Sequence, residues 1–522
     1  MKQPSPRIDV DLTELDQIID EGMRAPLSAS GGQKLKTTLH ALVERVAAHW
    51  RTTEKTRAVL EKPPGAESGP EKPPPAGSKP ASAGHGRNKA AQFPGAHKVV
   101  ISHATLRHGD PCPECGAGKV YRQKQSKTLV RIVGRPPLEA TRYAMERLRC
   151  NGCNQVFTAA APPEAGSEKY DETAAAMRAQ LGYGSGVPFK RLERLEGNLG
   201  IPLPAATQWG VVKKKAEWVR PALDELIRQA AQGEVAHNDD TGMRILHLAR
   251  EPAPEGQGER TGVFTSGIVC RVGVWLIALF FSGWKHAGEN LADVLKRRAP
   301  GLQPLIQMCD ALSRNVPKLS EGVRLLLANC RAHGRRPFVE VAANFPAECR
   351  YVLETLGSVW YNDELARRRN LSRDERRRFH QEHSALLMKT LKEWMEAQLA
   401  EHKTEPNSGL GKAIQSMLRH WEPLTLFLRE PGAPLDNNLV ERALKKAILH
   451  RKNSLFYKTM KGAEVGDLFM SLIHTCELNG VNAFDYLTEL QRHAGELKQR
   501  PSEWMPWNYR ETLARLATSA AA

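Results

Sequence analysis

The sequence contains no hydrophobic run long enough to cross a bilayer. Its longest apolar stretch, Val272–Phe281, is about half of the ~20 residues that a transmembrane helix needs. Residues Met1–Val10 do not show the charged and then apolar pattern of a secretory signal peptide. We therefore expect a soluble cytoplasmic protein that does not insert into a membrane.

Acidic residues are too few to balance the basic ones. The 522 residues include 75 Lys and Arg but only 58 Asp and Glu, which gives a formal net charge of +17. This excess favours an extended polyanion as partner, although charge alone does not separate nucleic acid from a membrane surface or a ribosome. The length exceeds what one hydrophobic core organises, so we expect roughly two to four structured units.

The nine cysteines are an odd number, which does not favour a framework of disulfides. Four of them form two C-x-x-C pairs, Cys112 with Cys115 and Cys150 with Cys153. Two such turns together supply the four thiolates of one closed, structural zinc site. The strings VYRQKQSKTLVRIV and RYAMERLRC between the pairs predict the hairpin strands of a zinc ribbon. Whether this module also contacts DNA is left open.

Composition and periodicity divide the chain into six regions. The first is a helical segment whose apolar stripe fits either dimerisation or packing on its own chain, and the second is rich in Pro, Gly and Ser and is predicted to be disordered. A zinc-binding domain, a helical pair, a mixed α/β core with a helical insertion at about 365–420, and a C-terminal helical tail follow. Their predicted bounds are 1–55, 56–98, 99–162, 168–232, 233–480 and 481–522.

Two short helices are predicted in the fourth region. Pro188–Asn198 and Ala205–Arg220 have helical patterns and are joined by a turn at Gly200–Pro204. This order is typical of a helix-turn-helix, in which the second helix enters the major groove of DNA, but a plain pair of packed helices gives the same pattern. The second helix carries three lysines that are candidate phosphate contacts: Lys213, Lys214 and Lys215.

Acidic residues in apolar surroundings are candidate metal ligands. Asp239 and Asp240 lie within a predicted strand, and Asp310 closes an apolar run. Glu441 lies early in a predicted helix. Buried charges are costly unless they are paired, hydrated or bound to metal. Because neighbours along a strand point to opposite faces, only one of Asp239 and Asp240 readily joins a given site. Singly, each acid also fits a solvated strand end, a turn or a helix cap.

Several longer strings form a recognisable set. They are Gly84–Asn88, Gly109–Cys115, His237–Thr241, Cys330–Phe338 and Asp436–Ala443, the last continuing through His450–Phe456 to Leu478–Gly480. With these strings the chain resembles the transposases of the insertion sequence 66 family over nearly its whole length. The resemblance implies a multidomain α+β protein with an N-terminal helix, a zinc-binding domain, a helix-turn-helix and a ribonuclease-H-like α/β core that carries a DDE catalytic triad.

The resemblance also implies the members of the triad. Asp239 takes the first acidic position, in a string where Asp240 replaces the family's usual Glu, and Asp239 is preferred as the ligand. Asp310 matches the second position by its place at a strand end, since the residues after it depart from the family's usual Gly-Tyr string. Glu441 lies in the longest matching string. Three carboxylates of this kind suit two Mg2+ (or Mn2+) ions.

The expected partners are double-stranded DNA at the element ends and at the target, other copies of the chain, and small accessory proteins encoded by the same element. Cys330 and His333 have the spacing of half a metal site, but no second pair is evident nearby, so phosphate contact or packing is preferred for His333. A solvated helix face is the alternative for the basic residues after Glu441. The candidate DNA contacts in the core are His333, Arg335, Arg336, Arg442, Lys445, Arg451 and Lys452.

The function that we predict is a DNA transposase that cleaves and transfers strands with the help of metal ions. A nuclease with the same core that never joins strands is one alternative. Another is a non-catalytic, zinc-containing DNA-binding regulator or an inactive transposase descendant. The presence of Asp239, Asp310 and Glu441 argues against loss of activity.

Overall fold

The structure, a computed structural model, describes residues 98–123, 129, 131–132, 135–151, 153–248, 260, 262–319 and 322–521. The predicted N-terminal helix and nearly all of the predicted linker lie outside these residues. No helix of the described part is long and apolar enough to span a membrane. The described residues fall into two compact units, one that ends at Glu139 and one that begins at Ala140.

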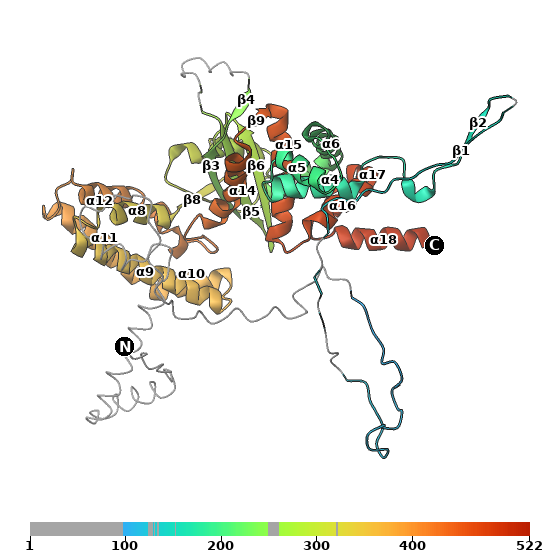
Figure 1. The fold of residues 1–522 in the computed structure, drawn as a ribbon. Helices are drawn as coiled ribbons and strands as arrows, with labels where there is room; N and C mark the ends of the chain where they lie inside the picture. The colour runs from blue at the N-terminus through green and yellow to red at the C-terminus, as the bar shows by residue number, and fades with distance from the viewer. Residues whose placement is uncertain are drawn as a thin grey trace, which may run out of the picture. The chain divides into compact units, whose positions relative to one another are not determined.

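A mixed five-stranded sheet organises the larger unit (Figure 1). The strand order is β6-β5-β3-β7-β8, with β5 antiparallel to both β3 and β6, and β7 parallel to both β3 and β8. The strands are rich in apolar and β-branched residues and are largely buried, which suits a sheet covered on both faces. Their bounds are β3 (Val235–Gly242), β5 (Phe264–Val272), β6 (Trp275–Gly283), β7 (Leu305–Cys309) and β8 (Leu325–Asn329).

Helices cover the two faces of this sheet. α7 (Ala287–Leu295) packs on β3 and β5 from one face, and α14 (Asn438–Ser454) packs on the same two strands from the other. A short parallel pair, β4 (Ile245–His247) with β9 (Tyr457–Thr459), joins the end of β3 to the segment after α14. The elements around β3 therefore come from segments that lie far apart in the sequence.

The outer edge of β6 is closed by α15 (Met460–Leu478) rather than by another strand. Polar side chains spaced four residues apart on the helix side accept hydrogen bonds from every second backbone amide of the strand. An open strand edge is a template for unwanted pairing, and these side chains occupy it. The amides of Ser282, Phe280, Ala278 and Leu276 donate to the side chains of Asp467, Ser471, Thr475 and Asn479, in that order.

The helical pair predicted as a helix-turn-helix is present and packs into the same core as the sheet. The second helix continues past its predicted end at Arg220. Buried Arg178 holds the helices together, because its guanidinium lies 3.6 Å from the buried carboxylate of Glu196 and donates to Gln208. The elements are α4 (Glu172–Ala179), the π-helical turn η3 (Gln180–Gly184), α5 (Phe189–Asn198) and α6 (Ala205–Ala230).

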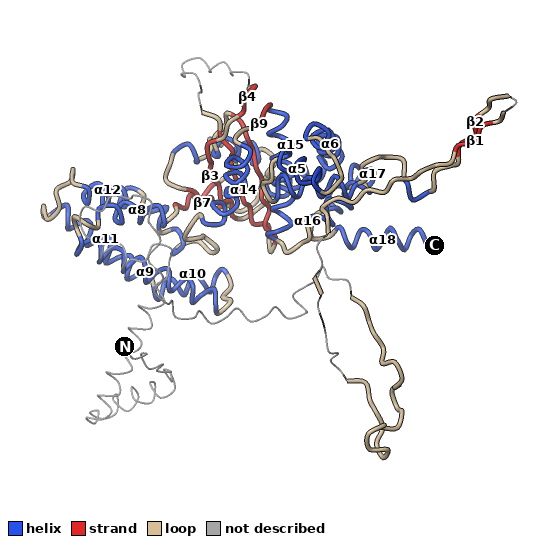
Figure 2. The backbone as a smooth tube through the Cα atoms, in the orientation of Figure 1, coloured by secondary structure: helices blue, strands red, loops and turns tan. Residues whose placement is uncertain are grey.

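The helical insertion between β8 and α14 is larger than predicted. It begins directly after β8, not at about 365, and its hydrophobic core also includes Val235, Ile306, Met308 and Ala328 of the sheet. Ser372 and Glu375 form a capping box at the start of α10, and the helical run that follows is interrupted at Ser384. Figure 2 shows this region as a cluster of helices. They are α8 (Arg331–Val341), α9 (Pro346–Arg368), α10 (Arg373–His383), α11 (Ala385–Ala400), α12 (Gly409–Arg419), α13 (Trp421–Leu424) and η5 (Leu426–Leu428).

The end of the chain is helical, as predicted. α16 packs on α4 and α15, and the hydroxyl of Tyr486 donates to the carbonyl of Trp504, 2.9 Å away. These contacts attach the tail to the sheet region. The elements are α16 (Ala483–Arg492), α17 (Ala494–Gln499), η6 (Pro501–Trp504) and α18 (Tyr509–Ala521).

Candidate metal-binding active site

Strand β3 presents its two adjacent aspartates to different faces. Asp239 is the cross-strand partner of Gly267, where an added Cβ would meet Leu444 of α14 at 2.9 Å. Asp240 is the partner of Ser266, whose hydroxyl accepts a hydrogen bond from Asn290 of α7. Because cross-strand partners point to the same side of a sheet, Asp239 lies on the α14 face and Asp240 on the α7 face.

Asp239 and Asp310 share one amide group. Asp310 follows the last residue of β7, next to β3 in the sheet, as the strand-end prediction required. The side-chain nitrogen of Asn315 lies 2.5 Å from Oδ1 of Asp310 and 3.3 Å from Oδ1 of Asp239. The structure therefore brings together two carboxylates that are far apart in the sequence.

The electrostatics of this pair favour a cation. The pKa of Asp239 is raised to about 6, chiefly by burial and in part by the negative charges of Asp310 and Asp240, while hydrogen bonds from the Asp240 amide and Asn315 oppose this shift. The nearby His237 is buried, which lowers its pKa to about 4 and keeps its ring uncharged at neutral pH. No cationic side chain is paired with Asp239 among the described ion pairs. A divalent ion would supply the missing positive charge.

Asp240 has the opposite environment. Its carboxylate side chain is only 2 % exposed, and its Oδ2 lies 2.8 Å from Nδ1 of His286. Arg314 approaches its Oδ1 at 3.5 Å. These partners balance the charge of Asp240 within the protein, so the geometry favours Asp239 as the metal ligand of the two.

Glu441 lies in the first turn of α14, on the helix that covers the Asp239 face of the sheet. The beginning of this helix is fixed to β3 by Asn437. Its side-chain nitrogen donates to the carbonyl of Asn238 at 3.1 Å, and its Oδ1 lies 3.2 Å from Nδ1 of His237. These bonds hold the first turn of α14 against the strand that carries Asp239.

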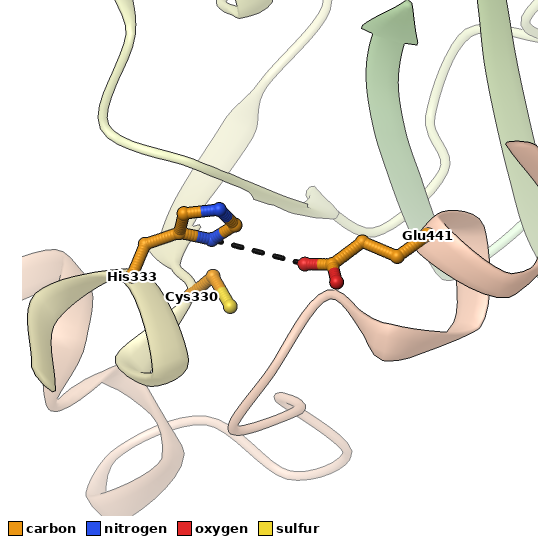
Figure 3. A group of neighbouring side chains, drawn as sticks. All are labelled: Cys330, His333 and Glu441. Carbon is orange, nitrogen blue, oxygen red and sulfur yellow. Dashed lines mark ion pairs between the residues drawn. The ribbon is translucent and has the colours of Figure 1, made fainter. Parts of the chain in front are cut away.

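Glu441 also faces two residues at the start of α8 (Figure 3). Its Oε1 lies 3.8 Å from Nδ1 of His333. Potential ligand atoms of Cys330, His333 and Glu441 all lie within 4.8 Å of one another. The sequence showed Cys330 and His333 without a further ligand, and the structure adds Glu441 to them.

The three lysines of α6 differ in their surroundings. The Lys215 side chain is 2 % exposed, lies 3.0 Å from the carboxylate of Glu172 and sits 3.6 Å from the ring centre of Trp218. The predicted phosphate contact is therefore wrong for Lys215, whose ammonium is occupied inside the protein. Lys214 is exposed but lies 2.8 Å from a carboxylate oxygen of Glu168. Lys213 is exposed and stays a candidate.

The basic residues of the core also differ. Arg451 donates to Thr241 Oγ1 at 3.2 Å and to the carbonyl of Gly242, so it ties the last turn of α14 to the end of β3. Arg335 is half-buried in α8, beside exposed Arg336. The remaining candidates are exposed on α14: Arg442, Lys445 and Lys452.

The cysteine pairs occupy two tight turns. In the first, the amide of Cys112 donates to Gly118, and hydrogen bonds from the backbone of Gly118 and Ala117 lower the pKa of Cys115. In the second, the amide of Cys150 donates to Gln155. In the first turn the side chains of Cys112 and Cys115 also contact each other. The two turns belong to different units of the chain, and the four-thiolate zinc site stays a prediction.

The strand pairing of the predicted zinc ribbon is different from the expected one. β1 (Arg147–Arg149) lies within the second predicted string, but it pairs with β2 (Val156–Thr158), beyond the second cysteine pair. The described residues of the first string are not in a strand. The hairpin is therefore local to Cys150 and Cys153.

Sequence reasoning missed Asn315 and Asn437. Asn315 contacts both aspartates, and Asn437 fixes the helix of Glu441. The signal for Asn437 was its place in the long matching string before Glu441. Asn315 had none, because it lies in a segment that departs from the family's usual string.

Residues 169–465, more than half of the chain, match the family model described as Transposase IS66 family. The chain belongs to this family. It is 26% identical over 421 residues to the uncharacterized protein y4jD of Sinorhizobium fredii (strain NBRC 101917 / NGR234), covering 76% of this chain and 78% of that protein. It is 25% identical over 450 residues to the uncharacterized protein y4hP of the same organism, covering 81% and 77%. No solved structure matches the chain.

The matched region of this IS66-family transposase runs from just before α4 into α15. It contains Asp239, Asp310 and Glu441, and it contains the whole helical insertion. The two cysteine turns lie before it. Family membership therefore applies most directly to the sheet region and its covering helices.

Proposed function

We propose that the protein is a DNA transposase with a ribonuclease-H-like core in which Asp239, Asp310 and Glu441 bind two Mg2+ (or Mn2+) ions. The observation that carries the proposal is the shared contact of Asp239 and Asp310 with Asn315 at the centre of the sheet. The sheet supports it, because three antiparallel strands followed by two parallel ones, in the order β6-β5-β3-β7-β8, are the arrangement of ribonuclease-H-like folds.

The residues present fit a hard divalent cation. Asp239 and Asp310 offer carboxylate oxygens, which Mg2+ prefers to nitrogen or sulfur. Their mutual repulsion contributes to the raised pKa of Asp239, as expected of acids that lack a counter-ion. When bound, such ions activate the attacking oxygen and stabilise the leaving oxygen at the phosphate. Glu441 would complete the ligand set from α14, the helix that covers the face of the sheet on which Asp239 lies.

Other residues of the chain have supporting roles in this proposal. Asn315 orients Asp239 and Asp310 relative to each other, and Asn437 fixes the first turn of α14. His237 stays neutral and therefore does not repel the ions. Phosphate groups of the bound strand would contact the basic residues around the site: His333, Arg335, Arg336, Arg442, Lys445 and Lys452.

The expected substrates are the two ends of the element and the target duplex, bound by more than one copy of the chain. A zinc ion held by the two cysteine turns would have a structural role in end binding. Small accessory proteins of the same element are expected to assist, so the test must supply them.

The test is transposition in cells that carry the complete element. Asp239→Asn, Asp310→Asn and Glu441→Gln each remove a charge with little change of shape, and each is expected to abolish excision and integration. Glu340→Gln, which changes an exposed residue of α8, is the control and should transpose normally.

Binding of the element ends by the purified variants separates this proposal from a non-catalytic regulator. Variants that bind the ends but do not transpose support catalysis by the three acids. Normal transposition by Asp239→Asn would contradict the assignment. End binding by the unmodified protein without any strand cleavage would favour the regulator.

A further inference from the structure

Cys330, His333 and Glu441 form a cluster of three different metal-binding groups. Cys330 directly precedes α8, His333 lies in the first turn of that helix, and Glu441 lies in the first turn of α14. Their ligand atoms all lie within 4.8 Å of one another, and Figure 3 shows the three side chains converging. The cluster joins the start of the helical insertion to the helix that covers the sheet.

The spacing between His333 and Glu441 is unusual for a direct contact. The 3.8 Å between Nδ1 and Oε1 is too long for a hydrogen bond. Both atoms are buried and have no hydrogen-bond partner among the described residues. Two ligand atoms bound at about 2.0–2.2 Å to one tetrahedral zinc ion are roughly 3.3–3.5 Å apart. The observed separation is therefore close to that of two groups that share an ion.

The sulfur of Cys330 is buried, which raises the pKa of the thiol to about 11, so the thiolate forms when a bound cation stabilises it. The amide of Asn437 donates to it at 3.3 Å. Cys330 is the N-cap of α8 and therefore lies at the positive end of the helix. Metal-bound ligands commonly have such outer hydrogen bonds, which orient them and stabilise their charge.

We propose that Cys330, His333 and Glu441 bind a zinc-class divalent cation. A sulfur, an imidazole nitrogen and a carboxylate oxygen together suit Zn2+ and do not suit Mg2+. Three protein ligands leave the fourth position of a tetrahedral ion for water or a phosphate oxygen. Glu441 binds this ion through Oε1, which leaves Oε2 for the catalytic ions. That last step rests on the proposed function, whereas the zinc site itself does not.

The first experiment measures zinc per chain in the purified full-length protein by mass spectrometry of the metal. Cys330→Ser and His333→Gln are each expected to contain about one zinc ion per chain less than the unmodified protein, because each removes a ligand. Cys349→Ser is the matched control, since Cys349 is a buried cysteine of the same helical region outside the cluster. It should keep the full zinc content.

Replacement of zinc by Co2+ tests the ligand type. The charge-transfer absorption from thiolate to cobalt at this site should disappear in Cys330→Ser and remain in Cys349→Ser. Glu441→Gln should shift the ligand-field bands, whereas Asp239→Asn should leave them unchanged. His333→Gln changes a side chain that is 30 % exposed and therefore tests the site even if Cys330→Ser does not fold.

Zinc content and cobalt spectra that are the same in the unmodified protein, Cys330→Ser and His333→Gln would overturn the zinc site, whatever the protein does to DNA. If both variants lose zinc but the unmodified protein never cleaves DNA, the zinc site is supported and only the proposed function is contradicted.

Discussion

The two neighbouring acids of β3 lie on opposite faces of the sheet and have different charges around them. On the α7 face, Asp240 is buried and lies against His286 and Arg314. On the α14 face, Asp239 shares an amide with a second acid and is paired with no cationic side chain of the described residues. The difference shows that the charge around an acid, rather than its burial, separates a structural carboxylate from a candidate metal ligand.

Removal of the negative charge of Asp239, on the α14 face, should have the largest effect on strand cleavage. Asp239→Asn removes a ligand and should lower the rate of strand cleavage by about a thousandfold, because loss of metal-based charge stabilisation amounts to several kcal/mol. The rate is measured on DNA that carries an element end, with Mg2+ and the accessory proteins present. A cleavage rate within a factor of ten of that of the unmodified protein would contradict the distinction between Asp239 as a metal ligand and Asp240 as a structural acid.

A third buried acid tests whether burial alone matters. Burial raises the pKa of Asp467 from its ordinary 3.8 to about 7, although both of its oxygens accept hydrogen bonds from Ser282. The folded state therefore holds this proton more tightly than the unfolded state does. Its contribution to stability is fully present below about pH 4 and is lost as the pH rises toward 7.

Asp467→Asn should remove this part of the pH dependence, which is on the order of 4 kcal/mol between those limits. Urea unfolding of the variant and of the unmodified protein at several pH values measures the difference. Glu511→Gln, an exposed change on α18 that is not among the groups acting on the pKa of Asp467, is the control. Parallel pH profiles for Asp467→Asn and the unmodified protein would show that Asp467 is ionised in the fold.

The smallest effect is expected on the α7 face. Asp240→Asn keeps an oxygen that accepts from His286 but loses the charge that faces Arg314. Because the Arg314 side chain is 45 % exposed, water replaces part of that interaction. We expect a loss of about 1–2 kcal/mol in unfolding free energy and cleavage that remains within a factor of ten. A loss of cleavage as large as that of Asp239→Asn would make Asp240 the ligand instead.

The positions of the acids along their elements could be predicted from the sequence. An apolar run that ends in Asp310 predicts a carboxylate at a strand end, and alternation along β3 predicts that Asp239 and Asp240 diverge. Both depend only on neighbours in the chain. The helix that contains Glu441 was likewise evident from its string.

Contacts between distant segments could not be predicted in this way. Asn315 and Asn437 act through residues of other elements, and nothing in the sequence around Asn315 marks it. Lys215 appears equivalent to Lys213 in the sequence, yet the turn of α6 directs it toward Glu172 and Trp218. The size of the insertion was underestimated because α8 and α9 carry mixed polar and apolar patterns with weak boundaries.

The side chains of α15 that bind the edge of β6 impose a length limit on both elements. Four residues of a helix advance about 6.0 Å, whereas two residues of a strand advance about 6.6–6.8 Å. The two repeats therefore fall out of step by under 1 Å at each interval, and the match extends only from Asp467 to Asn479. A one-residue insertion within that span of α15 would rotate every later side chain by about 100°, away from the strand. Length variation among relatives should accordingly fall outside this span.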